Sequence, residues 1–563
     1  MHTSKHKASK DSESTGFDSA EFAKNMAEAA GHCQKILQEF MVNQAHDIPN
    51  ISIDPLNIGD AFMELFTRLM SDPAKMWEKQ MSLWQDYLQL WQKSANKMLG
   101  EKENPIITPD AKDRRFRDDA WQENTVFDFI KQSYLLTARW LQHAVHDAAE
   151  TMTPEMAKKL DFYTRQFVDA MSPSNFLMTN PEVLKATIES KGENLVKGLE
   201  NLLEDLERGK GKLRISMTDL GAFKIGKNLA VTPGKVVFQN DLMQLIQYEP
   251  TTKTVNQTPL LIIPAWINKF YILDLQPENS AVKWLIDQGH TVFMISWVNP
   301  DEHLSKKSFE DYMLEGPIAA MDVIQEITGE KKVSIAGYCL GGTLLATTLA
   351  WLTAKKLDHR IACATYLTTM VDFGDSGELS VFIDEEQLKA LEDRMSQMGY
   401  LDGSEMAVTF SMLRANDLIW SFVVNNYLLG KDPFPFDLLY WNADSTRMPA
   451  AMHSYYLRNM YQKNLLAKPN ALKLAGQNID LTRITTPSFI LSCREDHIAP
   501  WKSTYAATQL YKGPVEFVLA ASGHIAGVVN PPEKQKYSHW IWTKKSSLPS
   551  TADEWFKSAS EQA

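Results

Sequence analysis

Apolar residues follow two different periodicities in the two parts of the chain. Up to about residue 205 they recur at spacings of three and four, which predicts amphipathic helices. From about residue 210 they form short runs separated by amphipathic stretches, which predicts strands alternating with helices. We therefore expect a disordered polar N-terminus at 1–18, a helical N-terminal domain at 19–205 and an α/β domain at 206–563.

The clearest helical stripe lies between residues 77 and 91. Trp77, Met81, Trp84, Leu88 and Trp91 follow one another at spacings of four and three, so they share one face of a helix. Either this stripe packs against its own domain, or it forms a face for a partner helix or an apolar surface. The second interpretation follows from the cost of leaving indole rings in water.

Seven short runs in the second part of the chain predict strands. Because amphipathic stretches such as 281–288 and 343–352 lie between them, we expect a mainly parallel sheet with helices on both faces. The runs are Val236–Phe238, Leu260–Ile263, Val292–Trp297, Val333–Ala336, Ala364–Met370, Ser488–Cys493 and Val515–Leu519.

One connection between these runs is much longer than a single crossover helix. It leaves the run that ends at Met370 and returns at Ser488, and its segment Val371–Pro449 is rich in aromatic residues and helical patterns. An insertion of this size at the carboxyl edge of a sheet predicts a cap, or lid, over a site at that edge.

Composition and charge exclude several classes of protein. Hydrophobic residues make up 44% and charged residues 23% of the 563, as in a globular protein with a large core. The net charge of -12 argues against nucleic acid as the main partner. No apolar run approaches the ~18 residues of a transmembrane span, and the N-terminus lacks the apolar segment of a signal peptide. We expect a cytoplasmic protein.

Metal and nucleotide sites are not expected. The four cysteines form no C-x-x-C pair, and the histidines show no metal-ligand spacing. The segment from Gly221 to Asn228 resembles a phosphate-binding loop, but Asn228 stands where Ser or Thr would hold magnesium.

The segment that carries chemistry is Gly337-Tyr338-Cys339-Leu340-Gly341. An apolar strand leads into it and a helix-forming stretch follows, which is the nucleophile elbow of α/β hydrolases with Cys in place of Ser. Cys339 would then lie at a helix N-terminus, where the helix dipole stabilises negative charge. The alternative is a structural cysteine in a glycine-rich turn.

A nucleophile of this kind needs a base and a group that orients the base. In this fold both follow the nucleophile in chain order, each just after a strand. Asp496 follows the run that ends at Cys493, and His524 follows the run that ends at Leu519. His497 is the rival base. The rival acids are Asp372 and Asp375, which lie on the loop after the predicted strand Ala364–Met370.

The oxyanion that forms during acyl transfer needs two backbone N–H donors. Leu340, directly after the nucleophile, would supply one of them. The second is expected from the loop after Leu260–Ile263, where we favour the N–H of Ile267.

The cysteine itself indicates a substrate class. A thiolate that attacks an ordinary ester forms a less stable thioester, whereas its attack on a thioester exchanges one C–S bond for another. Cys339 therefore favours a CoA-type thioester donor and a persistent acyl-enzyme whose acceptor is a hydroxyl.

Taken together, these residues resemble the polyhydroxyalkanoate synthases, and most closely the single-chain class I enzymes that prefer short-chain monomers. The resemblance runs from about residue 110 to residue 540. Its motifs are Asp113–Phe116, Phe127–Leu136, Pro264–Ile272, Ser296–Pro300, Gly337–Thr343, Leu413–Trp420, Phe436–Asn442, Arg494–Ile498 and Ser522–His524.

The resemblance implies an α/β-hydrolase domain that polymerises (R)-3-hydroxyacyl-CoA into polyester with release of CoA. Cys339 would carry the growing chain, and His524, oriented by Asp496, would activate the thiol or the incoming hydroxyl. It also implies a homodimer on cytoplasmic storage granules, with contacts from the helical domain to the granule and its phasin-type proteins. No metal or prosthetic group is expected.

Two other functions stay open at this point. A cysteine-dependent depolymerase or thioesterase would use the same triad with water as the acceptor. A non-catalytic granule-surface protein would keep the fold for binding, although such a protein needs no nucleophile.

Overall fold

The computed structural model describes residues 19–46, 73–150, 152–544 and 546–563, and six single residues between the first two segments. The N-terminus at 1–18, predicted to be disordered, lies outside the described residues. Within the described part, no helix is both long enough and apolar enough to cross a membrane.

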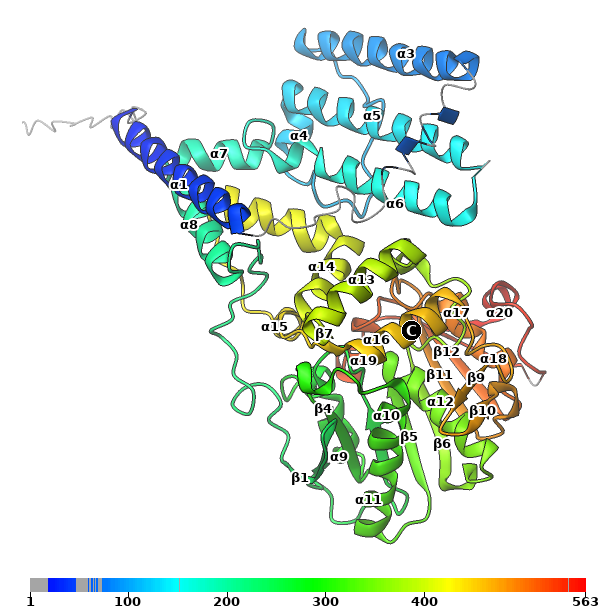
Figure 1. The fold of residues 1–563 in the computed structure, drawn as a ribbon. Coiled ribbons are helices and arrows are strands. Elements are labelled where there is room, and N and C mark those ends of the chain that lie inside the picture. The colour runs from blue at the N-terminus through cyan, green and yellow to red at the C-terminus, as the bar shows by residue number, and fades with distance from the viewer. Residues whose placement is uncertain are drawn as a thin grey trace, which may run out of the picture.

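The described residues up to 208 lie mostly in helices. Side chains of Asn124, Thr153 and Asn180 accept hydrogen bonds from backbone N–H groups and so fix the starts of three of the helices. In Figure 1, α3, α5 and α6 form one layer, while α1 packs along α8. The helices are α1 (Ser19–His46), α3 (Pro73–Met98), α4 (Ala120–Glu123), α5 (Thr125–Ala149), α6 (Pro154–Ala170), α7 (Pro181–Glu189) and α8 (Glu193–Arg208).

The helix α3, which carries the stripe from Trp77 to Trp91, lies at the edge of the molecule in Figure 1. Trp77 and Trp91 are each 68% exposed, and the other three stripe residues are also largely exposed. The inner face packs on α5, where Leu90 is buried and the Tyr87 hydroxyl lies 2.7 Å from that of Thr137. The interpretation that the stripe packs against its own domain is therefore wrong.

The second part of the chain forms a ten-stranded sheet in the order β1-β2-β4-β3-β5-β6-β11-β12-β13-β14. The six strands from β4 to β12 are parallel, and the strands at both edges are antiparallel. The strands are β1 (Gly234–Gln239), β2 (Met243–Tyr248), β3 (Leu260–Ile263), β4 (Val292–Trp297), β5 (Val333–Tyr338), β6 (Ile361–Leu367), β11 (Ser488–Cys493), β12 (Val515–Ala520), β13 (His539–Ile541) and β14 (Ser560–Gln562).

All seven predicted strands are present, and three of them have the predicted bounds. The run predicted to end at Met370 ends at Leu367, because the chain turns away at Thr368 with a positive φ of 45°. The sequence pattern did not predict β2, which lies near one edge and mixes apolar residues with two glutamines, or the short strands β13 and β14. The mainly parallel sheet is confirmed.

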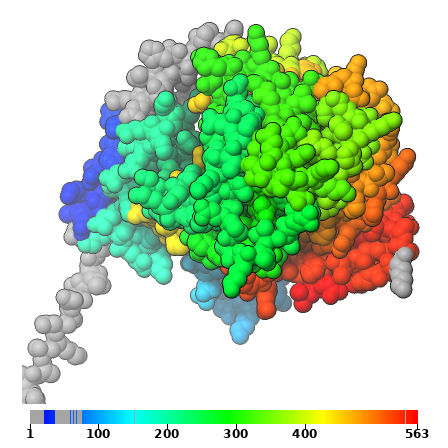
Figure 2. All heavy atoms as spheres, turned by 90° about the horizontal axis from the view of Figure 1, so that it is seen from below, coloured from blue at the N-terminus to red at the C-terminus, as the bar shows by residue number. Residues whose placement is uncertain are grey.

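Helices cover the sheet on both faces, as expected (Figure 1). Among them, α12 is buried along nearly its whole length, from Leu340 to Leu352, and lies inside the molecule. Seen from below in Figure 2, the chain from β1 onward forms one continuous body with α1 along one side. These helices are α9 (Ala281–Asp287), α10 (Phe309–Met313), α11 (Ala319–Thr328), α12 (Leu340–Ala354), α17 (Trp501–Tyr505), α18 (Ala507–Leu510), α19 (Ala526–Val529) and α20 (Ala552–Ser558).

The long connection between β6 and β11 forms a helical layer between the sheet and the N-terminal helices (Figure 1). The N-terminal region holds this layer in place: Asn194 donates to the Leu428 carbonyl at 2.7 Å, and Lys159 pairs with Asp384 at 2.8 Å. The layer contains α13 (Glu385–Met398), α14 (Gly403–Leu413), α15 (Asp437–Ala443) and α16 (Ala450–Tyr456), with β7 (Tyr400–Leu401) paired to β8 (Met448–Pro449). A further small hairpin pairs β9 (Leu472–Leu474) with β10 (Gln477–Ile479).

The packing of the β5–α12 turn against β3 gives a first prediction. A side chain at Gly341 would overlap the carbonyl oxygen of Ile263, and neither backbone segment has room to move. We expect Gly341→Ala to destabilise the fold by about 3 kcal/mol or more, measured by chemical denaturation. The matched control is Gly31→Ala in α1, where a Cβ meets nothing within 4 Å. Equal stability of the two variants would contradict this account of the turn.

Candidate active site

Cys339 lies on the turn between β5 and α12 with a strained backbone conformation, φ 53° and ψ -121°. Non-glycine residues seldom adopt a positive φ, so the surrounding packing must impose it. Added Cβ atoms at Gly341 and Gly342 would overlap Ile263 and Thr369, which shows how closely the turn approaches its neighbours. The nucleophile elbow predicted from the sequence is therefore present.

His524 and Asp496 meet although 28 residues separate them. Asp496 follows β11 and His524 follows β12, and these two strands pair in parallel, so both residues lie at one edge of the sheet. His524 Nδ1 lies 2.7 Å from Asp496 Oδ2. The other carboxylate oxygen accepts the N–H groups of Ile498 at 2.8 Å and Ala499 at 2.9 Å, which fixes its orientation.

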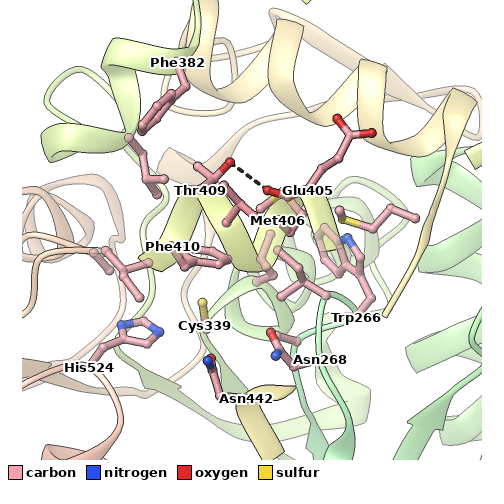
Figure 3. Close-up of a pocket in the computed structure, with 18 of the residues that line it drawn as sticks. Trp266, Asn268, Cys339, Phe382, Glu405, Met406, Thr409, Phe410, Asn442 and His524 are labelled. Carbon is pink, nitrogen blue, oxygen red and sulfur yellow. Dashed lines mark hydrogen bonds between the residues drawn. The ribbon is translucent and has the colours of Figure 1, made fainter. Parts of the chain in front are cut away.

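The His524 ring and the Cys339 thiol lie at the same cavity in Figure 3. Burial alone would lower the pKa of His524, but the charges of Asp496 and Cys339 and hydrogen bonding to both raise that pKa well above its usual value. The arrangement thus stabilises an imidazolium beside the sulfur. Such a histidine can take up a thiol proton and return it.

The rival residues from the sequence occupy other positions. His497 lines the cavity, but burial and the nearby Arg414 lower its pKa to about 4, and its Nδ1 has no partner among the described residues. Asp372 accepts from the side chain of Asn464 at 2.8 Å, and Asp375 pairs with Lys158 at 3.0 Å. Of these acids, only Asp496 contacts a histidine in the described structure.

The two backbone groups predicted to bind an oxyanion both belong to residues that line the cavity with Cys339. Leu340 is the first residue of α12, and Ile267 lies in the turn that follows β3. Neither N–H has an acceptor within the described part of the chain. Both are therefore free to donate to a bound substrate.

The cavity has a volume of about 800 Å³ and lies between the sheet edge and the helical layer. Met406, Thr409 and Phe410 of α14 face it from the layer, while Trp266 and Asn268 face it from the loop after β3 (Figure 3). Most of its walls are apolar. A flexible acyl chain fits such a space, and water gains little from entering it.

Sequence analysis missed most of this wall. His453 and Tyr456 of α16 line the cavity, and Tyr461 follows them. Spacing of three residues places His453 and Tyr456 on one helical face, but nothing in the sequence indicates that this face meets the β5–α12 turn. Among the described residues, no group of three or more His, Cys, Asp or Glu side chains is placed to hold a metal.

Comparison with known proteins agrees with this geometry. A family profile described as "Poly-beta-hydroxybutyrate polymerase (PhaC) N-terminus" matches residues 112–285, and one described as "alpha/beta hydrolase fold" matches residues 258–531. A poly(3-hydroxyalkanoate) polymerase of Methylorubrum extorquens is 49% identical over 533 residues, covering 92% of this chain and 88% of the relative. The chain belongs to the poly(3-hydroxyalkanoate) polymerase family.

Further members of the polymerase family match nearly as well. The polymerase subunit PhaC of Rhizobium meliloti is 47% identical over 93% of this chain and 85% of its own length. The corresponding subunit of Cupriavidus necator is 46% identical over 80% of this chain and 75% of its own length. The resemblance to polyhydroxyalkanoate synthases and the α/β-hydrolase fold are both confirmed.

The buried histidine of α16 gives a prediction about acid stability. Burial lowers the pKa of His453 from 6.5 to about 4, so the folded protein keeps it neutral while the unfolded chain protonates it. The stability that neutral His453 gives the fold is therefore fully present above pH 6.5 and is lost as the pH falls towards 4. The loss in the free energy of unfolding amounts to up to about 3 kcal/mol. We expect His453→Phe to reduce the fall in unfolding temperature between about pH 7 and pH 4.5, measured by circular dichroism.

Tyr455→Phe is the control for this measurement. Tyr455 is the next-but-one residue on the same helix and its hydroxyl is buried, but it does not titrate in this range because burial raises its pKa to about 12. Its variant should keep the parent's acid sensitivity. An unchanged fall in His453→Phe would show that His453 is not a neutral buried group.

Proposed function

We propose that this protein polymerises (R)-3-hydroxyacyl-CoA, in particular 3-hydroxybutyryl-CoA and other short-chain monomers, into polyhydroxyalkanoate with release of CoA. The observation that carries the proposal is the arrangement of Cys339, His524 and Asp496 at a mostly apolar cavity, in a chain of the polymerase family. No cofactor is required, since CoA is part of the substrate.

In the first half-reaction, the sulfur of Cys339 attacks the thioester carbonyl of the substrate. His524 accepts the thiol proton and passes it to the departing CoA sulfur, so one C–S bond forms as another breaks. The N–H groups of Leu340 and Ile267 would stabilise the oxyanion that develops on the carbonyl. Asp496 keeps the imidazole oriented and balances its positive charge.

In the second half-reaction, the 3-hydroxyl of another monomer attacks the acyl group on Cys339. His524 takes the hydroxyl proton and returns it to the sulfur, which leaves a new ester bond and a chain that ends in a CoA thioester. Cys339 then attacks that thioester, and CoA is released. Each cycle therefore lengthens the chain by one monomer.

A hydrolase of the same fold is the second candidate, because water can replace the hydroxyl without any change in the triad. The mostly apolar lining around Cys339 favours transfer, since it makes the space beside the acyl-enzyme a poor place for water. Membership of the poly(3-hydroxyalkanoate) polymerase family also favours acyl transfer to a hydroxyl over hydrolysis.

The helical region suggests where the protein meets a granule. We propose that the exposed stripe on α3, Trp77, Met81, Trp84, Leu88 and Trp91, contacts the apolar polyester surface or a phasin-type protein that covers it. We also propose that the protein forms a homodimer and is located on cytoplasmic granules. The boundaries of the helical domain at residue 205 and of the cap at 371–449 are proposals as well.

Incubation of the purified protein with 3-hydroxybutyryl-CoA tests the main proposal. A polymerase gives free CoA and insoluble polyester, a hydrolase gives CoA and soluble 3-hydroxybutyrate, and a binding protein gives neither. We expect Cys339→Ala to abolish CoA release while the protein stays folded, because the partly exposed thiol packs like a small apolar group that Ala can replace. CoA release above a few per cent of the parent would overturn the assignment of the nucleophile.

A pair of histidine variants tests the choice of base. We expect His524→Gln to prevent acylation of Cys339, a loss of at least about 100-fold, whereas His497→Gln keeps most of the activity. Asp496→Asn should slow acylation without abolishing it. These effects are measured by mass spectrometry of the acyl-enzyme after rapid mixing. Loss of acylation in His497→Gln alone would reverse the assignment.

A further inference from the structure

Several buried polar atoms around the catalytic cavity have no hydrogen-bond partner among the described residues. Apart from His497, they are Trp266 Nε1, Thr368 Oγ1 and His453 Nδ1. Buried polar groups are nearly always paired, so unpaired ones beside a cavity point to a ligand that pairs with them. Of these atoms, Nδ1 of His453 belongs to the wall that α16 contributes.

His453 is only 3% exposed and belongs to the cavity wall formed by α16. Its Nδ1 is sealed from solvent without a partner, and no described residue bonds its Nε2 either. Because the side chain lines the cavity and Nδ1 is sealed, Nε2 is the ring nitrogen left to face the cavity.

The position of His453 is separate from the triad. Tyr456, one turn later on α16, packs edge-on against Trp266 with ring centroids 5.5 Å apart. Burial, the neighbouring Tyr461 and the charge of Cys339 together raise the pKa of Tyr456, whereas burial alone sets that of His453. His453 has no contact with Asp496 or His524 among the hydrogen bonds of the described residues, and it lies on α16 rather than on the loops that carry those two residues.

The protonation state decides what His453 offers to a ligand. The ring is neutral, so one nitrogen carries a proton and the other carries a lone pair. Buried N–H groups without an acceptor are rarer in proteins than buried acceptors without a donor. Because Nδ1 is buried and unpaired, this favours the lone pair at Nδ1 and the proton at Nε2. His453 then presents an N–H donor to an apolar cavity.

We propose that the Nε2–H group of His453 binds a carbonyl oxygen of the molecule held in the catalytic cavity, at a point along the wall from Cys339. This proposal rests on the proposed function and makes His453 a positioning residue. The carbonyl has two possible sources: an ester group of the growing polyester, or an amide of the pantetheine arm of CoA. Both offer the same acceptor.

The test compares His453→Phe, which removes the donor, with His453→Asn, which keeps one, and with Tyr455→Phe. The hydroxyl of Tyr455 is also buried and unpartnered, but Tyr455 does not line the cavity, so it is the matched control. Should His453→Phe fail to fold, His453→Met removes the donor with a more adaptable side chain. Thermal unfolding establishes which variants are folded.

Two readouts distinguish the sources of the carbonyl. If it belongs to pantetheine, His453→Phe should raise KM for 3-hydroxybutyryl-CoA and weaken inhibition by free CoA, each by about 10-fold, with little change in kcat. If it belongs to the polyester, those values should stay as in the parent. Acylation by a CoA thioester of the 3-hydroxybutyrate trimer should then slow about 10-fold, and the polymer should be shorter.

In either case His453→Asn should recover most of the loss, and Tyr455→Phe should match the parent. Parent-like values of KM, CoA inhibition, trimer acylation and polymer length in a folded variant without the donor would overturn the proposal. Failure of the proposed function has a different signature, because then the parent itself makes no polymer or Cys339→Ala still releases CoA.

Discussion

The contact between the β5–α12 turn and the end of β3 is the constraint on which the site depends. Gly341 lies against the carbonyl oxygen of Ile263, and Gly342 lies against the side chain of Thr369. With these approaches fixed, the backbone of Cys339 is held at a positive φ and its sulfur projects beyond the sheet edge. The same contact brings the start of α12 next to the end of β3 and the loop that follows it.

The parallel arrangement of the central strands explains how distant residues join this turn. β5, β6, β11 and β12 are neighbours in the sheet, so the loops after them open at one edge. His524 and Asp496 meet there although neither is near Cys339 in the sequence, and the buried carboxylate is held by two backbone N–H groups. Burial alone would lower the pKa of His524, but its interactions with Asp496 and Cys339 raise that pKa and favour the charged form.

The helical layer over this edge sets the surroundings of Cys339, Asp496 and His524. It forms one wall of the mostly apolar cavity that contains Cys339, and it is bonded to residues of the N-terminal helices such as Asn194 and Lys159. The two halves of the chain thus contribute to one site. The N-terminal helices support the layer on one side and expose the apolar face of α3 on the other, a combination suited to an enzyme whose product is an insoluble polyester.

Sequence by itself determined the parts of this protein whose signals are local. The central strands were predicted run by run, because parallel strands buried on both faces are continuously apolar. The elbow at Cys339 and the loops that carry Asp496 and His524 were predicted from short motifs beside those strands. By contrast, only the tertiary structure decided that the stripe on α3 faces outward and that His453 of α16 lines the cavity. A helical pattern fixes which residues share a face, but which neighbour covers that face depends on packing between segments far apart in the chain.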